Sequence, residues 1–334
     1  MTVEAEAATV SQVDTAAAIA SARPRCSTED MLQLLQDYDC WVFDLDGTIW
    51  RGNEVIEGVL DSVELLRKLG KKVIFMTNNS MKSRGTYLDK CLQLGLPAHV
   101  DDIYCSSYSA AAYLESIKFD KSKKAYVVGE RGIMQELAAV GIESLGGPDD
   151  NDKRATFSDE MQHDTQVGAV VCGVDPNLSY YKVQYASMCL LLNPGCLFIA
   201  TNTDSRGHFT PNLEWAGAGA TVGAIKGVVE REPIVTGKPS PFLMQDIAAK
   251  HGVQPARSIM VGDRLDTDVL WGLNTGMATL LVMTGVTDQQ KLAAQHSSSS
   301  GIKPHFVMDS FGDLRRVARE ALQQQQQQKQ QQQR

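Results

Sequence analysis

The sequence has few cysteines, no long apolar run and no excess of positive charge. Its seven cysteines are scattered through 334 residues and form no C-x-x-C pair, which argues against a disulfide framework or a zinc site. No run approaches 18 apolar residues, so we expect no membrane span. The net charge of −8 argues against a nucleic-acid coat or a membrane-surface protein. What remains is an acidic globular chain with reduced thiols, long enough for about two domains.

The two ends of the chain have compositions unlike that of a folded core. Residues 1–29 are rich in Ala, Ser and Thr, lack an apolar period and are expected to form a disordered tail. Glu4, Glu6 and Asp14 are unlike a transit peptide, and no secretory signal precedes them. Residues 1–29 are therefore interpreted either as a native tail or as the remnant of a cleaved targeting segment. Residues 323–334 form a glutamine-rich tail, which is expected to carry no specific chemistry.

Between these tails, short apolar runs alternate with helical patterns. Stretches such as CWVFD and KKVIFMTNN predict buried strands, and the stretches between strands repeat apolar residues at helical spacing. Alternating strands and helices predict right-handed βαβ units around a parallel sheet, which is the α/β class. We therefore predict one core domain from residues 30–117 and 233–322. Residues 118–232 have an alternation of their own and are predicted to be an inserted α/β domain.

Two aspartates close the first predicted strand, in the stretch DLDGT. Residues i and i+2 of an extended chain point to the same side, so Asp44 and Asp46 face one way. Gly47 allows a tight turn, and open α/β sheets bind ligands at the carboxyl ends of their strands. An ordinary turn would also explain these residues. A calcium-binding loop would not, because the positions that need Gly and Glu hold Ile49 and Val55.

Polar residues also follow two other predicted strands. Thr77, Asn78 and Asn79 come after the second strand and could form a neutral anion cradle, although plain loop chemistry explains them too. Lys238 stands in the stretch GKPS. It is no P-loop lysine, because the positions for the opening glycine and the closing hydroxyl hold glutamate and proline.

Three more acids follow an apolar strand near the C-terminus. Asp263, Asp266 and Asp268 stand in the stretch MVGDRLDTD, where folding alone gives little reason for three carboxylates. If the sheet brings this group to Asp44 and Asp46, their mutual repulsion requires a cation. Oxygen ligands alone favour Mg²⁺ over zinc or copper, and Mg²⁺ suits a phosphate substrate.

Taken in order, DLDGT, TNNS, GKPS and GDRLDTD resemble the four motifs of the haloacid dehalogenase superfamily of phosphatases. The resemblance spans about residues 30–315. The insertion resembles the C2 cap of the branch that contains 2-phosphoglycolate phosphatase and pyridoxal phosphate phosphatase. Within it, GVDPNLSYYK, NPGCLFIATNTD and GHFTPNLEWAGAG are most similar to plant- and alga-type phosphoglycolate phosphatases. The implied fold is a Rossmann-like parallel-sheet core with an inserted α/β C2 cap.

This resemblance implies a role for each aspartate. Asp44 would be the nucleophile that forms an aspartyl-phosphate, and Asp46 would protonate the leaving alkoxide and then deprotonate the attacking water. Mg²⁺ would be held by the Asp44 carboxylate, the Asp46 backbone carbonyl and Asp263. Asp268 would orient Lys238 or the metal's waters. Dehalogenases of the superfamily lack an aspartate at the position of Asp46, and related ion pumps have threonine there, so Asp46 favours a phosphatase.

The resemblance also implies roles in substrate binding. Thr77, Asn78 and Lys238 would hold the transferring phosphoryl group. Asn79 and His208 would contact the leaving group, although His208 also has an ordinary interpretation as a loop histidine.

The implied reaction is Mg²⁺-dependent hydrolysis of the small ester 2-phosphoglycolate to glycolate and phosphate, in photorespiration or metabolite repair. Pyridoxal phosphate is the alternative substrate, although Met81 departs from the NNSRR pattern of the phosphatases that hydrolyse it. A phosphoprotein phosphatase, a phosphotransferase and an inactive binding protein on the same scaffold are further alternatives. The family implies a homodimer formed through the cap, without nucleic-acid or membrane partners. The chloroplast stroma is the expected location in a plant or alga, and the cytoplasm is the alternative.

Overall fold

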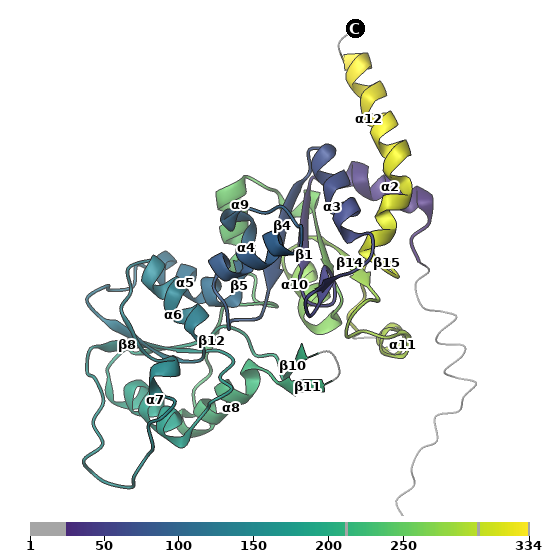
Figure 1. The fold of residues 1–334 in the computed structure, drawn as a ribbon. Helices are drawn as coiled ribbons and strands as arrows, with labels where there is room; N and C mark the ends of the chain where they lie inside the picture. The colour runs from purple at the N-terminus through teal and green to yellow at the C-terminus, as the bar shows by residue number, and fades with distance from the viewer. Residues whose placement is uncertain (1–24, 211–212, 299–300, 333–334) are drawn as a thin grey trace, which may run out of the picture.

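The computed structural model describes residues 25–210, 213–298 and 301–332. In this part of the chain, two parallel β-sheets lie side by side, each with helices packed against it (Figure 1). The predicted α/β class is therefore confirmed. We call the six-stranded sheet and its helices the core, and the five-stranded sheet and its helices the cap.

The core sheet has the strand order β15-β14-β13-β1-β4-β5, and all its neighbouring strands are parallel. Its strands are β1 (Cys40–Asp44), β4 (Lys72–Thr77), β5 (Ile103–Cys105), β13 (Ser258–Gly262), β14 (Ala278–Val282) and β15 (Phe306–Met308). The helices of the core include α2 (Thr28–Asp37), α3 (Val59–Lys68), α4 (Arg84–Gln93), α9 (Phe242–His251), α10 (Leu270–Asn274), α11 (Gln289–Ser297) and α12 (Ala318–Gln332).

Strand β1 lies between β4 and β13 near the centre of this sheet. All five of its residues are buried, which explains why its sequence is a continuous apolar run up to Asp44. Phe43 packs edge-on against Phe311, with ring centroids 4.6 Å apart. The strand that ends in the first candidate residue is therefore held rigidly by its neighbours on every side.

The cap sheet has the order β12-β9-β8-β6-β7 and is also parallel throughout. Its strands are β6 (Lys124–Val128), β7 (Ser144–Gly146), β8 (Val167–Cys172), β9 (Leu197–Ala200) and β12 (Ile234–Val235). Its helices are α5 (Ser106–Ser116), α6 (Arg131–Ala139), α7 (Tyr180–Leu192) and α8 (Ala218–Val229). A hairpin of β10 (Arg206–Thr210) and β11 (Leu213–Ala216) projects from the cap toward the core (Figure 1).

Two elements that the sequence placed in the core pack with the cap. Helix α5 contributes Ala110, Ala111 and Leu114 to an apolar cluster whose other members include cap strand residues. Strand β12 pairs with β9 of the cap sheet. Helix α5 also packs with the core through Tyr108 and Ala112, and the bounds 118–232 stay a prediction.

The segment that follows β4 ties the cap to the core. The Gly132 N–H of α6 donates to the Met81 carbonyl at 3.2 Å. A Cβ on Gly132 would lie 2.4 Å from the Lys82 backbone, so only glycine allows this close approach. The buried Glu136 carboxylate accepts hydrogen bonds from the Arg84 N–H at 2.6 Å and from Arg84 Nε at 3.1 Å. The loop that carries the TNNS motif is thus held from both domains.

The structure describes part of each tail. Residues 1–24 of the predicted N-terminal tail lie outside the described residues, but α2 begins at Thr28, where Ser27 and Asp30 form a capping box. At the other end, α12 continues through the glutamine tract to Gln332 and projects away from the core (Figure 1). Glutamine is a fair helix former, which the compositional argument did not consider.

The membrane expectation can be compared with the helices directly. None of the helices in the described ranges is both long enough and apolar enough to cross a bilayer.

Candidate active site

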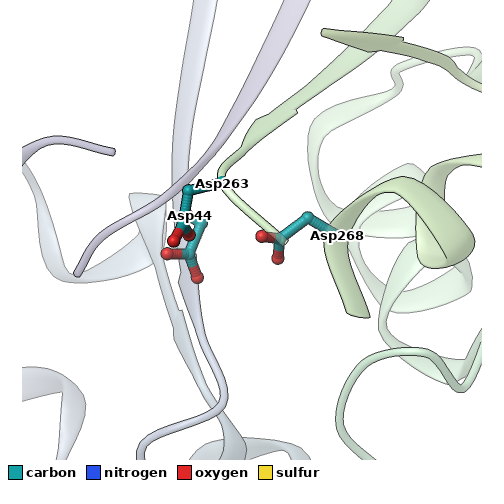
Figure 2. A group of neighbouring side chains, drawn as sticks. All are labelled: Asp44, Asp263 and Asp268. Atoms are coloured by element: carbon teal, nitrogen blue, oxygen red, sulfur yellow. The ribbon is translucent and has the colours of Figure 1, made fainter. Parts of the chain in front are cut away.

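The predicted motif residues meet at the carboxyl edge of the core sheet. Asp44 is the last residue of β1, Thr77 is the last residue of β4, and Asp263 directly follows β13. These strands are parallel neighbours, so their ends lie at the same edge. Asp268 comes from a π-helical turn (Leu265–Val269) that follows β13, and Figure 2 shows its carboxylate beside those of Asp44 and Asp263.

Lys238 enters this cluster from the segment that follows β12. Its ammonium group donates to Asp44 Oδ1 and to Asp268 Oδ1, both at 2.6 Å. Only 1% of the Lys238 side chain is exposed. Burial favours the neutral amine, but Asp268 and Asp44 outweigh it and raise the pKa of Lys238. Lys238 therefore remains a fixed positive charge beside the candidate nucleophile.

One lysine does not neutralise three buried carboxylates. Burial raises the pKa of Asp44 well above its usual value, and Asp268 and Asp263 add to this effect while Lys238 opposes it. Burial, assisted by Asp268, likewise raises the pKa of Asp263 to about 7. The site thus carries more negative charge than its own residues can compensate.

The surplus charge and the donor atoms fit a hard cation. Carboxylate oxygens of Asp44, Asp263 and Asp268 lie within 4.8 Å of one another. Asp263 Oδ2 accepts the Val286 N–H at 2.6 Å, whereas its buried Oδ1 finds no hydrogen-bond donor in the part of the chain that the structure describes. An all-oxygen set with an unsatisfied carboxylate oxygen suits Mg²⁺. The share of the Asp46 carbonyl in holding the metal stays a prediction.

Asp268 is arranged differently from Asp263. Its Oδ1 accepts from Lys238 and its Oδ2 accepts the Arg264 N–H at 3.0 Å. With both oxygens engaged by the protein, Asp268 is placed to orient Lys238, in line with the role that the resemblance implies.

Asp46 lies in the loop between β1 and β2 (Trp50–Arg51) and lines the same pocket. It is half-buried, and its Oδ1 accepts a hydrogen bond from Trp50 Nε1 at 2.8 Å. Gly47 has a φ of 89°, and a Cβ there would lie 2.8 Å from Asp263 Oδ2. The glycine of the DLDGT motif therefore serves both the turn and the close approach of the loop to Asp263.

The TNNS residues are used unequally. The Asn78 side chain joins the backbone of Lys238 twice, because Oδ1 accepts the Lys238 N–H and Nδ2 donates to the Lys238 carbonyl, both at 2.9 Å. This side chain therefore holds Lys238 in place; the predicted contact of Asn78 with the phosphoryl group stays a prediction. Asn79 donates its N–H to Thr77 Oγ1 at 3.1 Å, and both residues line the pocket.

The candidate from the cap hairpin cannot be placed in the same way. His208 belongs to β10 by its backbone, but its side chain lies outside the described residues. Its contact with the leaving group stays a prediction.

The pocket has a volume of about 90 Å³ and is lined in part by cap residues that the sequence reasoning missed. Asn202 and Asp204 follow β9, at the carboxyl end of a cap strand, and both line the pocket with Arg206 of β10. Asp204 accepts a hydrogen bond from Asn78 Nδ2 at 3.2 Å, and burial raises its pKa. The strand-end rule that found Asp44 would have found these two residues had it been applied to the cap.

Comparisons with known proteins agree with this geometry. Residues 41–143 match the family model described as haloacid dehalogenase-like hydrolase, and residues 235–314 match a second model, described as HAD-hydrolase-like. The chain is 48% identical over 287 residues to chloroplastic phosphoglycolate phosphatase 1A of Arabidopsis thaliana, covering 85% of this chain and 78% of that protein. It is 46% identical to phosphoglycolate phosphatase 2 of the same plant, covering 87% and 97%.

Relatives at lower sequence identity are named as phosphatases of other esters. The human glycerol-3-phosphate phosphatase is 36% identical, with 87% of this chain and 94% of that protein covered. Among solved structures, p-nitrophenyl phosphatase from Archaeoglobus fulgidus superposes with a TM-score of 0.72 at 30% identity, covering 84% and 99%. A glycerol phosphate phosphatase from Mycobacterium tuberculosis in complex with magnesium superposes with a TM-score of 0.69 at 26% identity, covering 86% and 79%.

The four motifs, the carboxylate cluster at the sheet edge and the extent of these matches lead to one assignment. The chain belongs to the haloacid dehalogenase-like hydrolases.

Proposed function

We propose that this hydrolase is a Mg²⁺-dependent phosphomonoester phosphatase whose substrate is 2-phosphoglycolate. The observation that carries the chemistry is the buried contact of Lys238 with Asp44 and Asp268 beside an uncompensated Asp263. Such a site can hold a phosphoryl group and a divalent cation next to a carboxylate nucleophile. The choice of substrate is supported by the 48% identity to a phosphoglycolate phosphatase.

The proposed reaction uses Asp44 as the nucleophile and Asp46 as the acid and base. Asp44 attacks phosphorus, so an Asp44–phosphorus bond forms while the bond from phosphorus to the alcohol oxygen breaks and Asp46 gives that oxygen a proton. Asp46 then takes a proton from water, which attacks the same phosphorus and returns Asp44 with release of phosphate. Lys238 compensates the charge of the phosphoryl oxygens throughout. Mg²⁺, when bound by Asp44, Asp46 and Asp263, would neutralise the phosphoryl oxygens and orient them.

The lining of the pocket favours a small ester. Asn202, Asp204 and Arg206 of the cap line it together with Asp44, and a site between cap and core suits a small molecule better than a folded phosphoprotein. Glycolate is among the smallest alcohols that a phosphatase could release. Pyridoxal phosphate and other small phosphomonoesters, such as glycerol 3-phosphate, are the alternatives.

The substrate assignment is tested by phosphate release from 2-phosphoglycolate, glycerol 3-phosphate and pyridoxal phosphate, each with Mg²⁺ and with EDTA. A Mg²⁺-dependent preference for 2-phosphoglycolate, measured as kcat/KM, is the expected result. Preference for another ester would retain the chemistry and overturn the substrate. Release from none of them would favour the alternative of an inactive binding protein.

The nucleophile is tested by Asp44→Asn. The amide has the same shape but cannot attack phosphorus, so we expect turnover to fall by a factor on the order of 10⁴ or more. Because Lys238 keeps its buried partner Asp268, and the amide removes a charge that Asp268 and Asp263 repel, the thermal unfolding midpoint should not fall. Near-normal phosphate release by this variant would contradict the mechanism.

The same proposal includes an assembly and a location. A homodimer formed through the cap is supported by exposed apolar side chains on the cap, described below. The chloroplast stroma, and with it a photorespiratory role, is supported by the chloroplastic relatives. A cytoplasmic location is the alternative.

A further inference from the structure

Trp50 is a buried residue at the active site that the mechanism above does not use. None of its surface is exposed, yet its indole N–H donates to Asp46 Oδ1 at 2.8 Å. We propose that Trp50 is the positioning residue for Asp46 and holds this carboxylate in the orientation from which it transfers protons. This inference rests on the proposed function, since it assigns a role to Asp46 as the acid and base of phosphoester hydrolysis.

The backbone fixes the distance between the two residues. The Gly47 N–H donates to the Trp50 carbonyl at 2.7 Å, and the Trp50 N–H donates to the Leu45 carbonyl at 3.2 Å. Trp50 then pairs with Val55 in a short antiparallel hairpin formed by β2 and β3 (Glu54–Val55). The indole edge therefore meets Asp46 in a loop closed at both ends, and the contact does not depend on a mobile side chain.

Lys90 of α4 lies over the face of the Trp50 ring and strengthens the hydrogen bond from the indole to Asp46. Its ammonium nitrogen lies 4.2 Å from the centre of the Trp50 ring, and its side chain is half-buried. A cation over an indole face is the strongest of the cation–π contacts. By drawing electron density from the ring, it makes the indole N–H a better donor to the carboxylate. Lys90, Trp50 and Asp46 thus form one electrostatic chain that ends at the pocket.

In this arrangement the two carboxylate oxygens of Asp46 have different roles. The indole holds one oxygen, which keeps the other available for the leaving-group oxygen and later for water. Without the indole, the side chain is free to rotate and the proton meets the leaving oxygen less often. The loss should be large for an alkoxide, which cannot leave without a proton, and small for 4-nitrophenolate, which leaves unprotonated.

The test is Trp50→Phe, which keeps an aromatic ring at this position but removes the indole N–H donor together with part of the ring. We expect kcat/KM for an alkyl ester that the wild type hydrolyses, 2-phosphoglycolate first, to fall about tenfold or more. For 4-nitrophenyl phosphate, kcat/KM should change by less than about threefold. This parameter reports the step in which the alcohol leaves, so the ratio of the two losses isolates the proton transfer. Lys90→Met should change this ratio less than Trp50→Phe does, and Lys90→Arg should keep the ratio of the wild type.

Trp41→Phe is the matched control. Trp41 is equally buried in the same region of the chain, but its indole donates to the Tyr38 carbonyl at 3.3 Å and not to Asp46. Its substitution removes the same atoms and should leave the ratio between the two esters unchanged.

A double-mutant cycle with Asp46→Asn completes the test. If Trp50 acts through Asp46, Trp50→Phe should have no further effect on the ratio in the Asp46→Asn background. Equal losses on both esters, or an undiminished effect in that background, would overturn the assignment and leave Trp50 a packing residue. Failure of the wild type to hydrolyse any of these esters would instead overturn the proposed function.

Discussion

Asp44, Lys238 and Asp268 are buried together, and Lys238 is the cation that the two carboxylates share, so its removal would leave both of them uncompensated. Sequence reasoning placed these residues at one site because each follows an apolar strand or belongs to a motif. It could not show that the Asn78 side chain holds Lys238, because an amide in a loop has many partners within reach. Nor could it show that the indole N–H of Trp50, an apolar residue at the start of a strand, would donate a hydrogen bond to Asp46.

Lys238→Met should destabilise the protein strongly. It leaves two buried carboxylates without their cation, which costs about 3–5 kcal/mol in the free energy of unfolding. Lys68→Met is the control, because Lys68 makes an exposed pair with Glu64 on α3 and should cost less than about 1 kcal/mol. Urea unfolding in EDTA measures both values. Equal effects of the two substitutions would show that the cluster does not depend on Lys238.

The metal-free protein should lose stability as the pH rises. The folded-state pKa of Asp263 is about 7, raised by burial above 3.8. Between these values the folded protein holds a proton that the unfolded chain has released, so the free energy of unfolding falls as pH increases, by at most about 4 kcal/mol. Unfolding in EDTA at about pH 5 and pH 7.5 measures this slope. Asp263→Asn should make the slope shallower, with a remainder of the same sign from Asp44, whose pKa burial also raises. Mg²⁺ should oppose the slope, and a slope of opposite sign would contradict the account.

At the scale of elements, apolar periodicity predicted most of the strands and helices. It did not predict which of the two sheets each element would pack with. Strand β12 has two residues, too few for a pattern that distinguishes the two sheets. Helix α5 carries small buried residues on most of its surface, so no single apolar face indicates its packing partner. The β10–β11 hairpin was not predicted as strands, because its exposed residues lack the alternation of a half-buried sheet.

The contact between α4 and α6 gives a prediction at this scale. Glu136→Ala removes the acceptor of two Arg84 hydrogen bonds and should cost about 1–3 kcal/mol. Hydrogen exchange should quicken at the start of α4 and in α6, while β1 and β13 stay protected. Glu136→Gln is the matched control, since it keeps an acceptor for the Arg84 N–H and should lose less. Uniformly faster exchange across the core sheet would show that the contact does not act locally.

At the scale of the whole molecule, the active site draws on both sheets, so the cap must keep a fixed position on the core. Asp44 and Asp263 come from the core, whereas Lys238, Asn202 and Asp204 follow cap strands. No stretch of sequence contains this information, because the two sets of strand ends meet only through the folded arrangement. The exposed surface of the cap takes no part in this arrangement and is considered next.

The outer side of α7 is unusually apolar for a free surface. Tyr180, Leu191 and Leu192 of α7 are each more than half exposed, and Phe157, which precedes β8, is 92% exposed. Phe157, Tyr180 and Leu192 line one groove. The rings of Phe157 and Tyr180 contact each other with centroids 5.8 Å apart, so the patch is continuous there. Contiguous exposed apolar residues mark an interaction surface.

If this patch joins two copies of the chain, the protein should sediment at twice its 36.5 kDa mass. Leu192→Glu would bury a charge in the interface and should yield monomers, with little change in the free energy of unfolding of each chain because Leu192 is exposed there. Leu92→Glu is the control, since Leu92 is 55% exposed on α4 of the core and lies outside the patch. Analytical ultracentrifugation distinguishes the outcomes. A wild type that sediments as a monomer at micromolar concentration would refute a cap dimer, and a dimer that survives Leu192→Glu would place the interface on another face.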